Sequence, residues 1–210
     1  GAPPALSGIA GNEWYDRAAA KSVTSVSDDI SKLVGGIAGM PGSSPRKLLV
    51  STVADELKMA GRGGKTIGVS IKDRSAILVA GHTADAAYWF DNDSGHWVTS
   101  DYYMTELPAW VKQLNDTRPA NRYLGADWMP LNAKSGDKPY CSLVAGKEDV
   151  PYCGSLEATP FGNELIEEMA EQALKNERLG LHDGVDVLTV SFSSNDYVGH
   201  ALGPDHPAIR

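Results

Sequence analysis

The sequence has little cysteine, no long apolar run and no excess of positive charge. Its 210 residues include two cysteines, and no stretch of 18 or more apolar residues occurs, so we expect no membrane span. Nineteen Lys and Arg residues stand against 27 Asp and Glu residues, giving a net charge of −8, and the basic residues are scattered. Because binding to a phosphate backbone needs a basic stripe, we expect no nucleic acid as the main partner.

The first residues, "GAPPALSGIAGNEW", also lack features of a natural beginning. They have neither the basic region nor the continuous apolar stretch of a signal peptide. They contain no initiator Met and open inside a turn-rich motif. We therefore do not expect this to be the natural start of the protein.

The two cysteines, Cys141 and Cys153, lie in the loop-like segment "PYCSLVAGKEDVPYC", which two "PYC" triplets flank symmetrically. The CxxC pattern of many zinc sites is absent. We interpret the pair as a disulfide, with two unpaired thiols as the alternative. Because disulfides persist in oxidising compartments, this interpretation favours a periplasmic or secreted protein.

Helical and extended patterns alternate along the chain, which predicts an α/β fold. The segment 44–61 predicts a long helix, because it combines capping and stop signals with apolar residues every four positions. The signals are Ser44, Pro45 and Gly61, and the expected buried face is Leu49, Val53 and Leu57. The segment 65–71, "KTIGVSI", predicts a strand directly after this helix.

Further elements follow in the second half of the chain. The segment "AAYWFDNDSGHWVTSDYY" predicts a β-hairpin around "NDSG", and its faint likeness to a calcium loop is better explained as a plain turn. We expect helices over 106–116 and 162–180, and a strand over 186–192 that is buried on both faces. We divide the chain into an α/β part (1–116), a loop-rich insertion (117–160) and a continuation of the α/β part (161–210).

Asp196 and His200 form the first of three polar clusters. They are four positions apart and follow the strand predicted over 186–192. A carboxylate and an imidazole at this spacing can bind one metal ion if the chain after the strand is helical or tight, and Zn²⁺ accepts both ligand types. Two ligands are too few for a catalytic zinc site. A polar loop without a metal is the alternative interpretation.

Lys72 and Arg74 form the second cluster, where the strand predicted over 65–71 ends. Residues two apart in an extended segment point the same way, so the two cations suit an anion with several oxygens, such as a phosphoryl group. A solvated basic turn paired with Asp73 is the alternative. The third cluster is Asn12 alone, in "GIAGNEW", whose amide can donate to an oxyanion but also suits an ordinary turn.

Taken together, "GIAGNEWYD", "SIKDRSAILVAGH" and "NDYVGHALGPDHPAIR" resemble successive motifs of the alkaline phosphatase superfamily. The likeness is greatest to the bacterial phosphate-irrepressible alkaline phosphatases with a threonine nucleophile, which resemble type I phosphodiesterase/nucleotide pyrophosphatases in fold. It covers essentially the whole chain, and "KDR" and "DYVGH" are its specific parts. The resemblance implies part of a mixed sheet flanked by helices.

The resemblance also implies a role for each cluster. Asp196 and His200 would ligate one zinc ion of the two in a complete active site, the ion that binds and activates water. Lys72 and Arg74 would hold one phosphoryl oxygen, and Asn12 another. The related diesterases lack the Lys–Arg pair, so its presence favours small phosphate monoesters as substrates.

The resemblance leaves the nucleophilic Thr and the remaining metal ligands of the family without a counterpart in this chain. We therefore expect a middle segment of a larger enzyme, with no catalytic nucleophile of its own and no activity in isolation. His206 lies too close to His200, in a Pro-flanked turn, to stand for a missing ligand. Two alternatives stay open: a phosphodiesterase or phosphonate hydrolase of the same superfamily, and a non-catalytic secreted metal-binding module.

Overall fold

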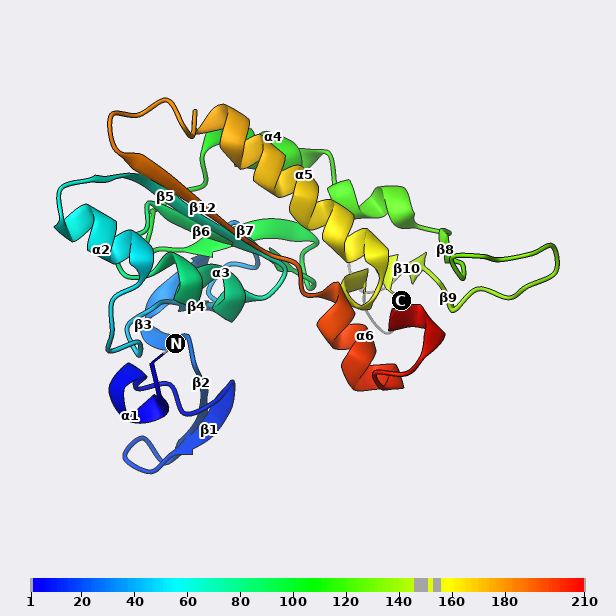
Figure 1. The fold of residues 1–210 in the computed structure, drawn as a ribbon, viewed down its shortest axis with the longest axis horizontal. Helices are drawn as coiled ribbons and strands as arrows, with labels where there is room; N and C mark the ends of the chain where they lie inside the picture. Colours follow the sequence, from blue (N-terminus) through cyan, green and yellow to red (C-terminus); the bar gives the residue numbers. More distant parts are fainter. Residues whose placement is uncertain (1, 146–150, 153–155, 210) are drawn as a thin grey trace.

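A computed structural model describes residues 2–145, 151–152 and 156–209 of the protein (Figure 1). A six-stranded sheet lies at its centre, in the order β12-β5-β6-β7-β3-β4. Its strands are β3 (Ser27–Val34), β4 (Pro41–Ser43), β5 (Gly63–Ser70), β6 (Ala86–Asp91), β7 (His96–Ser100) and β12 (Val185–Ser191). Neighbours β12, β5 and β6 run parallel, and the pairings on to β7, β3 and β4 are antiparallel. The predicted mixed α/β architecture is therefore confirmed.

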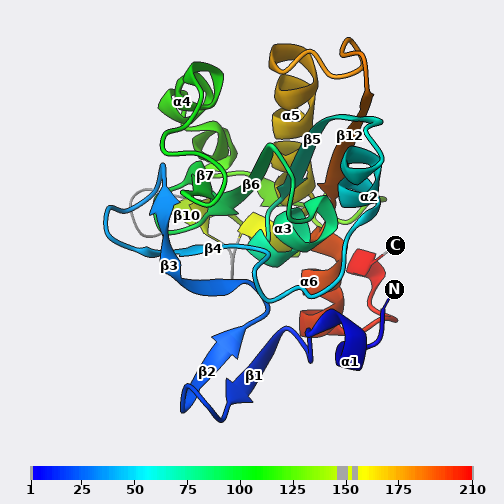
Figure 2. The same ribbon diagram turned by 90° about the vertical axis from the view of Figure 1, so that its left-hand side faces the viewer.

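Helices cover both faces of this sheet (Figures 1 and 2). Helices α4 (Ala109–Asp116) and α5 (Pro160–Asn176) lie on one face, and α2 (Val53–Met59) and α3 (Asp73–Ala80) lie on the other. Side chains alternate along β6 as a strand requires. Tyr88 and Phe90 join the core under α4 and α5, whereas Ala87 and Trp89 pack with α3.

Close packing between α3 and the centre of β5 depends on a glycine. A Cβ atom added to Gly68 would lie 2.2 Å from the carbonyl oxygen of Ala76 in α3. Such a separation is far below van der Waals contact, so a side chain at this position would push the helix off the strand. The glycine thereby fixes how deeply α3, and the polar residues at its start, sit against the sheet.

The remaining elements are short and lie outside the six-stranded sheet. Two of them, β1 and β2, form a hairpin at the lower edge of the view in Figures 1 and 2. The short elements outside the sheet are α1 (Pro4–Ser7), β1 (Glu13–Asp16), β2 (Lys21–Thr24), η1 (Pro119–Tyr123), β8 (Asp127–Trp128), β9 (Cys141–Ser142), β10 (Val144–Ala145), β11 (Pro151–Tyr152), η3 (Leu156–Ala158), α6 (Ser194–Leu202) and η4 (Pro207–Ile209). No helix of the described chain is long and apolar enough to cross a membrane.

The prediction of a long helix over 44–61 is wrong for the first half of that segment. The helix present, α2, begins only at Val53, because the Thr52 side chain accepts from the Asp55 N–H and the Asp55 carboxylate accepts from the Thr52 N–H. This capping box starts a helix at that point. Leu49 is 71% exposed and Val53 77% exposed, so two of the three residues of the predicted buried face are exposed.

Other predicted elements are present. The hairpin is formed by β6 and β7, and the Asp91 carboxylate accepts from Ser94 in its turn, which agrees with a plain turn. Helices α4 and α5 and strand β5 lie within the predicted ranges or close to them. Strand β12 is only half-buried, contrary to the prediction of burial on both faces, because β5 is its sole neighbour in the described sheet.

Within its described residues, the segment 117–159 contains only short elements. It nevertheless shares the main core, since Tyr123, Leu143 and Leu156 pack in the same cluster as Leu165 of α5. The division of the chain into three parts stays a prediction. So does the disulfide between Cys141 and Cys153, because Cys153 lies outside the described residues.

Candidate functional site at the carboxyl ends of two strands

The carboxyl ends of β5 and β12 lie side by side, with Ser70 paired to Ser191. The Ser70 hydroxyl donates to the Ser191 carbonyl at 3.0 Å and lies 3.5 Å from the Ser193 hydroxyl. Helix α3 begins three residues after Ser70, and α6 begins three residues after Ser191. In parallel sheets ligands bind beyond the carboxyl ends of the strands. The first residues of α3 and α6 therefore lie where a ligand is expected to bind.

Lys72 is the last extended residue before α3. Its backbone N–H donates to the Ser70 hydroxyl at 3.2 Å, and the residue is only 8% exposed. The prediction that Lys72 and Arg74 lie on one side of an extended segment is wrong, because α3 already begins at Asp73. Arg74 therefore lies in the first helical turn, where the helix dipole also favours an anion.

Asp196 and His200 lie one turn apart on α6, so the chain after the strand is helical. The His200 Nε2 atom lies 3.3 Å from Asp196 Oδ1, and the two side chains are 81% and 55% exposed. An oxygen and a nitrogen donor at this separation fit part of the coordination shell of zinc. Among the described residues, no group of three or more His, Cys, Asp or Glu side chains could hold a metal ion.

An ion pair joins the two clusters, because the Lys72 ammonium donates to the Asp196 carboxylate. This hydrogen bond is the main reason that the pKa of Asp196 is lowered, and the positive charge of Arg74 acts in the same direction. Asp196 therefore stays ionised, as a metal ligand must be. The sequence predicted both clusters separately, and the fold brings them together.

A cavity of ≈ 340 Å³ opens beside this ion pair. Lys72 and Arg74 line it, together with three residues that the sequence analysis did not single out: Asn92, Glu157 and Tyr197. The Tyr197 ring lies under the Lys72 ammonium, 4.0 Å from Nζ to the ring centroid. Tyr197 is part of "DYVGH", but the sequence gives no signal for Asn92 or Glu157, which come from a turn and from the loop-rich segment.

Asn12, the third cluster, lies in an exposed bend just before β1. Its carbonyl accepts from the Ser25 N–H at 3.0 Å. Within the described part of the chain, no hydrogen bond or ion pair joins its side chain to Lys72, Arg74, Asp196 or His200. The role of Asn12 as an oxyanion donor therefore stays a prediction.

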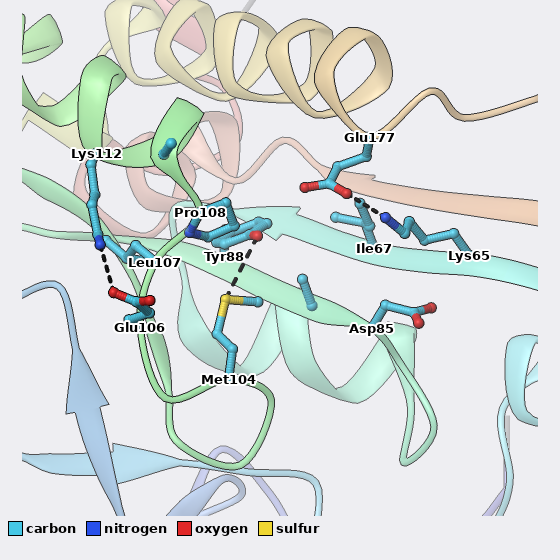
Figure 3. A pocket seen from close by; sticks show the side chains of 12 residues that line it. Lys65, Ile67, Asp85, Tyr88, Met104, Glu106, Leu107, Pro108, Lys112 and Glu177 are labelled. Carbon is cyan, nitrogen blue, oxygen red and sulfur yellow. Dashed lines mark hydrogen bonds and ion pairs between the residues drawn. The ribbon is translucent and has the colours of Figure 1, made fainter.

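A larger cavity, of ≈ 500 Å³, lies at the opposite ends of β5 and β6 (Figure 3). Its lysines are paired with carboxylates: Lys65 with Glu177, and Lys112 with Glu106. None of the residues that the sequence singled out lines it. We therefore place the candidate site beside the smaller cavity, because Lys72, which lines it, pairs with the predicted metal ligand Asp196.

The sequence profile described as "Type I phosphodiesterase / nucleotide pyrophosphatase" matches residues 1–210. The chain belongs to this family. It is 39% identical, over 98% of its length, to "Alkaline phosphatase PhoV" of Synechococcus elongatus and to "Alkaline phosphatase PafA" of Elizabethkingia meningoseptica, covering 41% of each. It also matches the crystal structure of wild-type alkaline phosphatase PafA with a TM-score of 0.83 and 36% identity, covering 98% of this chain and 44% of that one.

Membership of the type I phosphodiesterase/nucleotide pyrophosphatase family agrees with the resemblance seen in the sequence motifs. The relatives named here are phosphatases, and their likeness extends through the whole described fold. The chain spans about two fifths of the length of these curated relatives. The activity of the complete protein is therefore a proposal, which rests on the geometry of the site.

Proposed function

We propose that the full-length protein containing this chain is a zinc-dependent alkaline phosphatase that hydrolyses small phosphate monoesters through a phosphothreonine intermediate. The threonine and the remaining metal ligands would come from outside this chain. The observation that carries the proposal is the meeting of Lys72 and Arg74 with Asp196 and His200 at one edge of the sheet. Its phosphatase relatives support the same reaction class.

The residues of this chain suit the binding of a phosphoryl group. Lys72 supplies a buried point charge, and the planar guanidinium of Arg74 can bind a phosphoryl group through two parallel hydrogen bonds. Asn12 would donate to a further oxygen if it reaches the site in the complete protein. Asp196 and His200 would hold one zinc ion, with a second zinc ion elsewhere in the complete site. A bound zinc ion supplies Lewis-acid stabilisation of negative charge on the reacting oxygens.

Two cations beside the predicted metal ligands favour a monoester over a diester. A monoester presents a dianionic phosphoryl group, whereas a diester carries one charge and a second ester group that needs apolar surface. The family name of the matching profile still makes phosphodiester hydrolysis the second candidate. We further propose a periplasmic or secreted location, which rests on the predicted disulfide.

Kinetics of the purified full-length protein test the proposed function. The rates with 4-nitrophenyl phosphate and bis(4-nitrophenyl) phosphate are compared before chelation, after chelation and after zinc is restored. We expect a higher kcat/KM for the monoester, lost on chelation and recovered with zinc. A higher kcat/KM for the diester would favour the phosphodiesterase. Zinc binding without turnover of either ester would favour the metal-binding module.

A further inference from the structure

We propose that Tyr197 is a positioning residue that holds the Lys72 ammonium in place for the phosphoryl group, and that Glu157 and Asn92 fix Tyr197 in turn. This inference rests on the proposed function, because it gives Lys72 the role of a phosphoryl-binding cation. These three residues line the smaller cavity, and they are neither predicted metal ligands nor predicted to contact the phosphoryl group.

The first step is the contact between Tyr197 and Lys72. The Lys72 Nζ atom lies 4.0 Å from the centroid of the Tyr197 ring, within the range in which a ring face attracts a cation. Lysine has a flexible four-carbon stem, so an ammonium needs fixed neighbours to occupy one position. Asp196 is one such neighbour, but it is also a predicted metal ligand. Tyr197, unlike Asp196, is not a predicted metal ligand.

The second step is the anchoring of Tyr197. Tyr197 and Glu157 line the same cavity, and burial together with the nearby Glu157 carboxylate raises the pKa of Tyr197. Glu157 is 9% exposed, and its Oε1 atom accepts from the Asn92 side-chain amide. A buried carboxylate is costly without donors, so these contacts make the position of the ring well defined.

The third step is the origin of the four residues. Lys72 precedes α3, Asn92 lies in the β6–β7 turn, Glu157 lies in η3 and Tyr197 lies in the first turn of α6. Residues of four separate segments therefore line the cavity that Lys72 shares. The loop-rich segment 117–160 thereby reaches the site through Glu157, although none of its residues was predicted to act there.

Variants of the full-length, zinc-loaded protein test this role. Tyr197→Leu removes the ring, and Tyr197→Phe keeps the ring but removes its hydroxyl. Lys72→Ala and the double variant with Tyr197→Leu show whether Tyr197 acts through Lys72. The matched control is Tyr102→Leu, because the Arg46 guanidinium lies 4.8 Å from the Tyr102 ring. Within the described residues, no hydrogen bond, ion pair or ring contact joins this pair to Lys72, Tyr197 or Glu157.

We expect Tyr197→Leu to lower kcat/KM for 4-nitrophenyl phosphate about 10- to 100-fold, the size of effect that a small misplacement of a binding group can produce. The diester rate should change less than about threefold, since a diester gains less from the cation. Tyr197→Phe should lose less than Tyr197→Leu. In the background of Lys72→Ala, the second substitution should have almost no further effect. Tyr102→Leu should leave the ratio of monoester to diester rates unchanged.

Two measurements separate a positioning role from a structural one. Zinc content should stay the same in Tyr197→Leu, and the dissociation constant for inorganic phosphate, measured by calorimetry, should rise about tenfold. Equal losses for both esters, loss of zinc, or additivity with Lys72→Ala would overturn the inference. The rates of the wild-type protein with the two esters test the proposed function separately. If the wild-type protein hydrolyses neither ester, the phosphate titration still tests the contact between Tyr197 and Lys72.

Discussion

Lys72 donates a hydrogen bond to Asp196 across 124 positions of the sequence. The contact exists because β5 and β12 are neighbours in the sheet and each leads directly into a helix. It places a cation that can bind phosphate next to a carboxylate that can bind a metal. The Asp196 carboxylate therefore lies next to the predicted phosphate site and is also part of the predicted metal site. Substitutions at Lys72 and at Asp196 should affect the binding of phosphate and of zinc differently.

Replacing Arg74 should impair monoester hydrolysis selectively. We expect Arg74→Ala in the full-length protein to lower kcat/KM for a monoester about 10- to 100-fold, because a charge-assisted hydrogen bond is lost. The diester should be affected much less. The control Arg122→Ala also removes one guanidinium, but from an ion pair with Glu168. Steady-state kinetics with both esters check this, and equal loss for both would contradict the role of Arg74.

Replacing either predicted metal ligand should reduce bound zinc. Asp196→Asn and His200→Ala should weaken zinc binding by more than about 100-fold, because even changes to the partners of ligands cost roughly 10- to 100-fold. Elemental analysis after dialysis measures the effect. His206→Ala is the control, since His206 packs on Tyr140 instead. Full zinc content in both ligand variants would remove Asp196 and His200 from the metal site.

Asp55 should stabilise the protein in a pH-dependent way. Burial alone would raise the pKa of Asp55, but hydrogen bonds from Thr52, Thr83 and His82 lower it to about 2. Because the folded pKa is below the ordinary value, its stabilisation is present above about pH 4 and disappears as the pH falls through 2.

We expect Asp55→Asn to reduce the free energy of unfolding by about 2 kcal/mol at pH 7. The difference from the wild type should shrink as the pH falls from 4 towards 2. The control is Asp29→Asn, whose exposed ion pair with Lys21 contributes about 1 kcal/mol or less. Urea unfolding at several pH values measures both, and a difference that does not vary with pH would contradict the titration of Asp55.

The predicted disulfide should be detectable by thiol chemistry. Without reductant we expect no labelled thiol at Cys141 or Cys153, and after reduction under denaturing conditions we expect both to react. Cys141→Ser should lower stability by about 2–3 kcal/mol, the value for closing so short a loop. Two reactive thiols in the unreduced, unfolded protein would show that the bond is absent, and would remove the argument for a periplasmic or secreted location.

The isolated 210-residue chain should have no phosphatase activity. It has two of the predicted ligands of a two-metal site and no predicted nucleophile, so the roughly 10⁶-fold or greater acceleration typical of enzymes should be lost. A continuous assay with 4-nitrophenyl phosphate and added zinc checks this against the full-length protein. Zinc-dependent turnover by the pure segment would show that the nucleophile lies within these residues.

Local patterns in the sequence determined several elements correctly. Alternating apolar residues and a polar turn defined the β6–β7 hairpin, and helical apolar spacing in the segment 162–180 indicated α5, which ends at Asn176. The motifs around Lys72 and Asp196 identified the two clusters and the family. The helix over 44–61 failed because apolar spacing competed with the Thr52–Asp55 capping box, whose short-range hydrogen bonds set the actual start.

Only the tertiary structure decided how the clusters meet. Strand order places β12 beside β5, and sequence periodicity carries no information on which strands pair. The contacts of Lys72 with Asp196 and Tyr197, and of Tyr197 with Glu157, depend on that order and on a loop that folds back to the same edge. The sequence by itself determined which residues can carry the chemistry, because side-chain type is local. Their common position was decided by long-range pairing of strands, which no local pattern encodes.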